Sequence, residues 1–205
     1  MGKRKGNTRF FDCCTRQAYK VLEIHSKSGN NVRKVGVLSI QITPIGSIKT
    51  KSAGEELRNQ PIEELEADIE IFEEYADGLE GIDGFSHLLI FFYMHKITAE
   101  NRKRLKIKPR LVVRYGLNLE EVPLVGVFCL DSPNRPNPVG LSVVRLLWRK
   151  GKILHVKGID ALNETPVIDI KPYSPARRIE EFELPEWYKN IIAKARAKGH
   201  NITDF

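Results

Sequence analysis

Short apolar or alternating segments recur along most of the chain and predict a β-rich fold. The pattern predicts strands at residues 34–42, 45–48, 69–72, 86–94, 111–115, 123–130, 141–148, 152–159 and 167–170. These strands follow one another closely, with little helix between them, which favours a sheet that closes on itself. We therefore expect an all-β fold, built as a single closed or nearly closed β-barrel of short strands with small helical insertions.

Three segments carry helical patterns instead. Residues 52–67 suit a helix that Pro61 would interrupt, and residues 73–82 suit one or two helical turns. Residues 185–198 predict an amphipathic C-terminal helix, because one helical face collects its apolar side chains, Trp187, Ile191, Ile192 and Ala195. The expected organisation is a basic arm at 1–34, a barrel domain at 35–178 and a helical tail at 179–205.

A proline-rich segment, VGVFCLDSPNRPNPVGLS at residues 125–142, lies between apolar runs. Each proline fixes its own φ and pushes the preceding residue into an extended conformation, so the loop is stiff. It presents the polar side chains of Asn134, Arg135 and Asn137, and Gly140 permits a close backbone approach or a positive φ. The spacing fits a polar binding loop and a connection with no further task about equally well.

Charge is unevenly distributed along the chain, whose formal net charge is +7. Residues 55–83 hold twelve acidic residues against one basic residue, whereas residues 96–114 hold eight basic residues against one acidic residue. Clustered lysine and arginine supply the sequence-independent part of nucleic-acid binding. We therefore predict that the densest part of this cluster contacts RNA phosphates; it contains Arg102, Lys103, Arg104, Lys106 and Lys108.

Features that the sequence lacks disfavour several common classes of protein. No apolar run is long enough for a membrane span and the start lacks a secretory signal, so we expect a cytoplasmic protein without membrane contact. The three cysteines match neither a disulfide framework nor a zinc site, and no metal is expected. There is no Walker loop, no GxSxG, no HExxH and no glycine-rich dinucleotide turn.

A second polar motif, GIDALNETPVIDIKPY, occupies residues 158–173. Asn163 and Glu164 have turn character, and the following Thr-Pro pair fixes the entry to the next strand. By itself this motif fits a hairpin with ordinary polar tips. Two separate polar motifs with prolines in one small barrel make a functional site the better interpretation.

Three blocks of the chain, at residues 81–95, 125–142 and 160–173, resemble the TsaA-like (TrmO) family. The resemblance implies a single β-barrel that uses S-adenosylmethionine to methylate tRNA. It further implies a homodimer that acts on N6 of a threonylcarbamoyl-modified adenosine beside the anticodon. The similarity extends from about Pro44 to Tyr173, and its blocks occur in the order that the family has.

Matching the family's motifs residue by residue implies the cofactor contacts, whereas the basic cluster and the proline-rich loop suggest the tRNA contacts. The cofactor S-adenosyl-L-methionine would contact Gln60, Pro61, His95, Lys96, Asp131, Leu141, Asp160, Ala161, Leu162 and Asn163. The tRNA substrate would contact Arg135, Asn137, Arg102, Lys103 and Arg104. The chain departs from the family's pattern at Asp131, where a cationic residue is usual, and at Asn163, where an acid is usual.

The chemistry of these residue types suits a cofactor site. Asp160 and Asn163 offer acceptors for an amine or ammonium group, and Leu141 offers an apolar wall beside a sulfonium. Arg135 would either grip a phosphate bidentately or hold its own loop by pairing with an acid. The sequence identifies no general base; the acids and hydroxyl that qualify are Asp160, Asp169 and Tyr173.

An alternative from another class is a non-catalytic barrel that binds a nucleotide or RNA and acts as an adaptor. The departures at Asp131 and Asn163 keep this alternative open, because both fall in segments that would hold the cofactor. Methyl transfer to tRNA is the measurement that separates the two functions.

Overall fold

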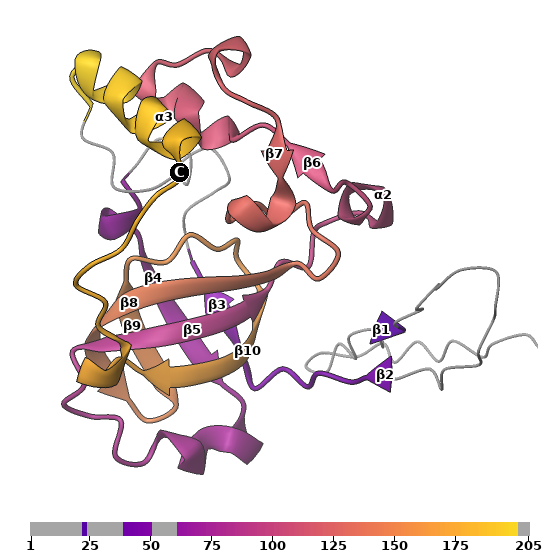
Figure 1. The fold of residues 1–205 in the computed structure, drawn as a ribbon. Coiled ribbons are helices and arrows are strands. Elements are labelled where there is room, and N and C mark those ends of the chain that lie inside the picture. Colours follow the sequence, from indigo (N-terminus) through magenta and orange to yellow (C-terminus); the bar gives the residue numbers. More distant parts are fainter. Residues whose placement is uncertain (1–21, 24–38, 51–60, 201–205) are drawn as a thin grey trace, which may run out of the picture. The chain divides into compact units, whose positions relative to one another are not determined.

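The computed structural model describes residues 22–23, 39–50 and 61–200, and its chain divides into two compact units, residues 1–44 and 45–205 (Figure 1). In the first unit, β1 (Leu22–Glu23) pairs antiparallel with β2 (Ser39–Ile40). Most of the predicted strand at 34–42 and most of the arm at 1–34 lie outside the described residues.

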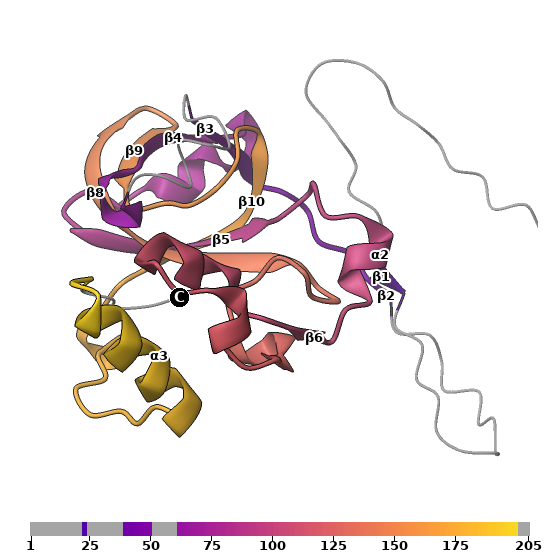
Figure 2. The same ribbon diagram turned by 90° about the horizontal axis from the view of Figure 1, so that it is seen from above.

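The second unit contains a closed antiparallel barrel of six strands, which confirms the predicted all-β barrel (Figures 1 and 2). Around the barrel the order is β10-β3-β4-β9-β8-β5. The strands are β3 (Gly46–Lys49), β4 (Glu66–Ile71), β5 (His87–Tyr93), β8 (Val139–Lys150), β9 (Ile153–Lys157) and β10 (Thr165–Pro172). Closure leaves no sheet edge in this barrel to pair with another chain.

Alternation along the strands builds the barrel's interior. In β5, Leu88, Ile90 and Phe92 are buried, whereas the residues between them face outward and are only partly covered. The same alternation buries Ile69 and Ile71 of β4. Each such side chain contributes roughly 1.5 to 3 kcal/mol on burial, so the barrel core is the main source of stability.

Short helical turns and one small ribbon complete the unit. The ribbon pairs β6 (Lys106–Ile107) with β7 (Val125–Gly126). The helical elements are η1 (Ile62–Glu64), η2 (Glu73–Leu79), α2 (Ala99–Arg102), η3 (Arg110–Tyr115), η4 (Leu119–Glu121), η5 (Val127–Cys129), η6 (Pro175–Arg177) and α3 (Glu186–Ala197). No described helix combines the length and apolar character that a membrane crossing requires.

Three sequence predictions are wrong in the described residues. Residues 111–115, predicted as a strand, form the 3-10 helix η3, and only two residues of the predicted strand at 123–130 are extended, as β7. The predicted helix at 52–67 is contradicted over 61–67, where η1 leads into β4; its residues 52–60 lie outside the described part.

The C-terminal helix α3 is confirmed, and it packs on the segment that contains η3 and η4. Their shared apolar cluster is fully buried and consists of Val112, Leu117, Val122, Ile191 and Ala195. Lys194 Nζ also donates a hydrogen bond to the carbonyl of Glu121 at 3.2 Å. The tail therefore forms a second, smaller core with residues 110–122.

Candidate functional site

The antiparallel topology brings the predicted cofactor segments to one end of the barrel. At this end, which we call the site end, β3, β5 and β9 finish, whereas β4, β8 and β10 begin (Figure 1). Pro61 precedes β4, His95 and Lys96 follow β5, the proline-rich loop precedes β8, and residues 160–163 join β9 to β10. Gln60 lies outside the described residues.

The turn at residues 160–163 is held against the end of β3. The Thr50 N–H donates to Asn163 Oδ1 at 3.1 Å, and the Glu164 N–H donates to the Ile48 carbonyl at 2.8 Å. Glu164 has a φ of 65°, and its carboxylate pairs with Lys49 Nζ at 2.7 Å. Ala161 is buried, so it contributes to barrel packing beside the turn. Asn163 therefore shapes the turn as an acid would, by accepting a backbone N–H.

His95 lies just beyond β5, where pairing with the proline-rich loop continues. The Met94 N–H donates to the Pro138 carbonyl at 2.8 Å, which places the turn at His95 and Lys96 beside that loop. Burial and then the charge of Lys96 lower the pKa of His95, against the opposing influence of Glu164. The imidazole is therefore neutral near pH 7 and offers one donor and one acceptor.

Asp160 keeps contact with solvent, but neighbouring protein atoms partly desolvate its carboxylate. This desolvation raises the pKa of Asp160, and the positive charge of Arg114 in η3 opposes the rise. Of the three residues that qualified as general base, only Asp160 lies at the site end. Tyr173 follows the far end of β10, where its N–H meets the His87 carbonyl at 3.1 Å, and Asp169 pairs with Lys171 at 2.5 Å.

The proline-rich loop is braced from within by Arg135. Its Nε donates to the Ser132 carbonyl at 2.8 Å, and its Nη2 donates to the Val127 carbonyl at 3.3 Å and to the Leu130 carbonyl. The guanidinium thus holds the loop through backbone carbonyls rather than through an acid. Other predicted site residues of the loop, Asp131 and Asn137, are exposed to solvent.

Leu141 lies on the outer surface of the barrel, where it is opposite Phe91 in the β5–β8 register and 53% exposed. Gly140, one residue earlier, is opposite Phe92, and the Phe92 ring occupies the space where a Cβ would be. The close backbone approach predicted for Gly140 is therefore confirmed. It brings the start of β8 against β5 and leaves the Leu141 side chain free for a ligand.

The residues of the predicted RNA-contacting cluster lie in different environments. Lys103 and Arg104 are exposed at the end of α2, and Lys106 is exposed on β6. Lys108 instead donates to the Leu119 carbonyl at 2.7 Å, and the Arg102 guanidinium lies over the Tyr93 ring.

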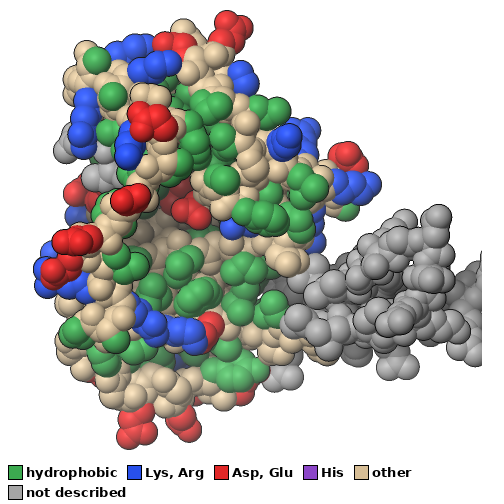
Figure 3. All heavy atoms as spheres, viewed as in Figure 1, with side chains coloured by type: hydrophobic (Ala, Val, Ile, Leu, Met, Phe, Trp, Pro, Cys, Tyr) green, Lys and Arg blue, Asp and Glu red, His purple; other side chains and the backbone are tan. Residues whose placement is uncertain are grey.

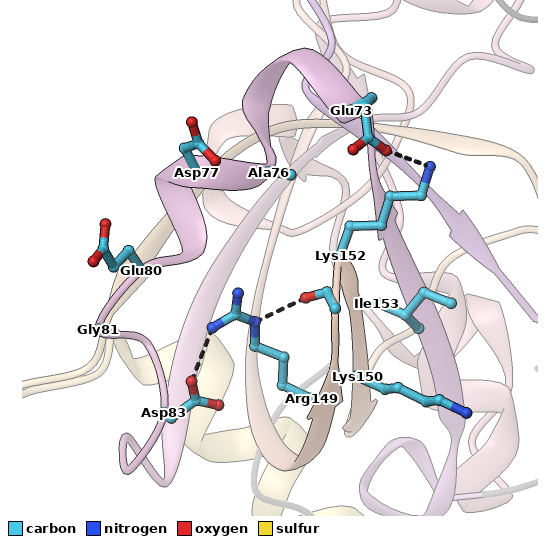
Figure 4. A pocket seen from close by; sticks show the side chains of 11 residues that line it. Glu73, Ala76, Asp77, Glu80, Gly81, Asp83, Arg149, Lys150, Lys152 and Ile153 are labelled. Carbon is cyan, nitrogen blue, oxygen red and sulfur yellow. Dashed lines mark hydrogen bonds and ion pairs between the residues drawn. The ribbon is translucent and has the colours of Figure 1, made fainter.

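A groove of about 740 Å³ lies at the opposite end of the barrel, between η2 and the β8–β9 turn (Figure 4). Its polar groups largely satisfy one another: Arg149 pairs with Asp83 at 2.8 Å, and Lys152 pairs with Glu73 at 3.2 Å. None of the predicted site residues lines it. We therefore place the functional site at the site end.

Two neighbours of the site were missed from the sequence. The Lys49–Glu164 ion pair joins residues 115 positions apart, and Arg114 was assigned to a strand rather than to the surroundings of Asp160. No local pattern marks either pair, because each depends on how the barrel closes.

Comparison with known proteins shows which family the chain resembles. Residues 50–177 match the family model of the tRNA-methyltransferase O N-terminal domain. A probable S-adenosyl-L-methionine-binding protein of Pyrococcus abyssi is 38% identical over 170 residues, which are 79% of this chain and 85% of that protein. A tRNA (adenine(37)-N6)-methyltransferase of Rattus norvegicus is 35% identical over 116 residues, 57% of this chain but only 24% of that protein.

Among solved structures, TrmO from Pseudomonas aeruginosa superposes with a TM-score of 0.54 at 26% identity. The match covers 71% of this chain and 62% of that chain, so the present chain spans less than two thirds of it. The family model covers well over half of the sequence and falls on the barrel with its site end. The chain therefore belongs to the tRNA-methyltransferase O N-terminal domain family.

Proposed function

We propose that this protein transfers a methyl group from S-adenosylmethionine to N6 of a threonylcarbamoyl-modified adenosine beside the anticodon of tRNA. Membership of the family supports the methyltransferase class, the cofactor and a tRNA substrate. The observation that carries the proposal is the convergence of the cofactor segments at the site end. The adenine N6 position is supported by the name of the rat relative.

The residues at the site end suit this reaction. N6 would attack the methyl carbon of S-adenosylmethionine in line as the S–CH3 bond breaks, which would leave S-adenosylhomocysteine and release the N6 proton to water. Catalysis would therefore rest mainly on positioning. Asp160 accepts a hydrogen bond from the cofactor's ammonium or adenine amine, Leu141 packs beside the sulfonium, and His95 offers a neutral donor and acceptor. The remaining assignments to the cofactor are Gln60, Pro61, Lys96, Asp131, Ala161, Leu162 and Asn163.

The homodimer is also part of the proposal. Hydrophobic side chains gather on the barrel face that carries β5 and β8 (Figure 3), where Leu141 and Val143 are 53% and 50% exposed. They face Phe91 and Leu89 across the strand register. A second copy would cover this apolar face. Sedimentation equilibrium tests the proposal, and a strictly monomeric protein at micromolar concentration would contradict it.

Methylation of tRNA tests the proposed function. Purified protein with labelled S-adenosylmethionine should label tRNA that carries the threonylcarbamoyl group and leave tRNA without it unlabelled. Protein that binds the modified tRNA but transfers no methyl would instead support the adaptor function.

Asp160→Asn should weaken binding of S-adenosylmethionine about ten- to a hundredfold, because it replaces a charged acceptor by a neutral amide and so weakens a charge-assisted hydrogen bond. Titration calorimetry measures this, with Asp169→Asn as the control, since Asp169 is an acid on β10 already paired with Lys171. Equal affinity in Asp160→Asn and wild type would remove Asp160 from the site.

The stability of the Asp160→Asn variant should change less with pH than that of the wild-type protein. Because the pKa of Asp160 is raised in the folded state, its contribution to stability is fully present below the ordinary pKa and is lost as the pH rises through the raised value. Asparagine has no proton to lose. The melting temperature relative to wild type should therefore rise between pH 4 and pH 7.

The exposed basic residues should set the salt dependence of tRNA binding. Replacing Lys103, Arg104 and Lys106 by alanine should flatten the slope of log affinity against log salt by about 0.7 to 0.9 for each phosphate that the variant no longer neutralises. Filter binding at several salt concentrations measures the slope. Lys152→Ala, at the opposite end of the barrel, is the matched control, and an unchanged slope in the triple variant would place the RNA elsewhere.

A further inference from the structure

Arg102 differs from the other basic residues of its loop. It is the last residue of α2, and its guanidinium carbon lies 5.4 Å from the centroid of the Tyr93 ring. Its Nε is buried and has no hydrogen-bond partner among the described residues. The next residue, Lys103, shows the contrast: its side chain is 74% exposed and pairs with Glu100 at 3.3 Å. Arg102 is therefore held in place, whereas Lys103 is solvated.

A buried donor without a partner is costly, at about 1 to 3 kcal/mol. The Tyr93 ring attracts the guanidinium by a cation–π interaction and limits its movement. The guanidinium is thus held over the ring, with its Nε desolvated, before any ligand arrives. An anionic group that accepts from the guanidinium would offset part of this cost, and little side-chain entropy would be lost on binding.

Arg102 lies at the site end of the barrel, so the anion that it could bind is one that reaches this end. Tyr93 is the final residue of β5 and is opposite Val139, the first residue of β8, in the strand register. It also lies two residues before His95. The guanidinium therefore sits over the last residue of β5 at the site end, whereas Lys103 and Arg104 are exposed.

We infer that Arg102 binds the carboxylate of an amino-acid group at the site end with its guanidinium. This inference rests on the proposed function, in which both reactants carry such a group: the methionine part of S-adenosylmethionine and the threonine part of the modified adenosine. A carboxylate matches the planar fork of arginine bidentately, and lysine cannot reproduce that geometry. Arg102 is in this view a specificity residue, separate from the phosphate-contacting lysines.

The experiment compares Arg102→Lys and Arg102→Met with the control Lys152→Ala, at the opposite end of the barrel. Calorimetry measures the affinity for S-adenosylmethionine and for its decarboxylated form. Methylation kinetics compare tRNA that carries the threonylcarbamoyl group with tRNA whose carbamoyl group lacks the carboxylate. We expect both Arg102 variants to lose at least tenfold in affinity or in kcat/KM for one of the two carboxylate-bearing ligands.

If the difference between an Arg102 variant and wild type disappears when the ligand lacks its carboxylate, that carboxylate is the group that Arg102 binds. A loss confined to S-adenosylmethionine assigns Arg102 to the cofactor, and a loss confined to the threonylcarbamoyl substrate assigns it to the tRNA base. Lys152→Ala should change neither. The melting temperature of Arg102→Met should change little, because the buried Nε makes no hydrogen bond that the variant would lose and the methionine side chain can still pack on the Tyr93 ring.

Two results would overturn the inference while leaving the proposed function intact. One is wild-type cofactor binding and methylation in both Arg102 variants. The other is a loss that is the same with and without either carboxylate and flattens the salt slope, which would make Arg102 a phosphate contact. A wild-type protein that binds no S-adenosylmethionine would overturn the proposed function itself, and this inference with it.

Discussion

Gly140→Ala is expected to destabilise the protein by about 1 to 3 kcal/mol, the usual cost of overpacking a well-packed core. A Cβ at this position would lie 2.9 Å from Phe92 Cδ2 and closer still to two other ring atoms. Phe92 is only 5% exposed and belongs to the barrel core, so its ring cannot swing into solvent. Either the ring or the start of β8 must shift.

Urea denaturation measures this destabilisation, and a second substitution tests its cause. Gly140→Ala combined with Phe92→Leu should lose less stability than the sum of the two single variants, because the smaller side chain makes room for the new methyl group. Gly78→Ala is the matched control, since no atom lies within 4 Å of the Cβ position there. Strict additivity would mean that the close approach between β5 and β8 does not limit Gly140.

Arg135→Lys is expected to cost about 1.5 to 3 kcal/mol, the range for a hydrogen bond to a charged group. In the loop, one guanidinium joins the carbonyls of Val127, Leu130 and Ser132. Lysine keeps the charge but has no planar fork, so it cannot bond to these carbonyls from two sides. The loop would loosen directly before β8, and cofactor affinity should fall together with the melting temperature.

Arg145→Lys, an exposed change of the same kind on β8, is the control and should stay within about 0.5 kcal/mol of wild type. Thermal melting and calorimetry with S-adenosylmethionine are measured on both variants. If Arg135→Lys melted like wild type but bound tRNA less well, Arg135 would be a direct substrate contact and the bracing role would be wrong.

The barrel was predictable because its strands carry their own signal. Alternation in β9 and the apolar run of β5 identify strands without knowledge of their neighbours, and α3 is identified by its apolar face in the same way. The close backbone approach at Gly140 was also predictable, because glycine alone has no side chain to keep the neighbouring strand away. These patterns do not indicate which strands pair, so they do not predict the order of the strands around the barrel.

The wrong predictions have a common physical cause. Residues 111–115 look like a strand because they are apolar and β-branched, but Val112 is buried against Ile191 and Ala195 of α3, far away in the sequence. A 3-10 helix presents that side chain to α3 as well as a strand would to a sheet. At residues 61–67, acidic composition suggested a helix, whereas Ala67 belongs to the barrel core.

The segments of the proposed site can be identified from the sequence, but their surroundings cannot. Asp160 and His95 lie in recognisable motifs at the ends of strands. Their electrostatic neighbours, Arg114 and Glu164, act on them only because the chain folds back to the same end of the barrel.

The packing of α3 on residues 110–122 has a consequence for synthesis on the ribosome. The chain emerges from its N-terminus, so Val112, Leu117 and Val122 are made well before the helix that covers them, and the bond from Lys194 to Glu121 spans 73 positions. All six barrel strands precede α3 in the sequence. We therefore expect the barrel to form on the nascent chain before α3 covers the apolar residues of segment 110–122. Arg114 lies in that segment, and the charge environment of Asp160 would be completed only after α3 has been made.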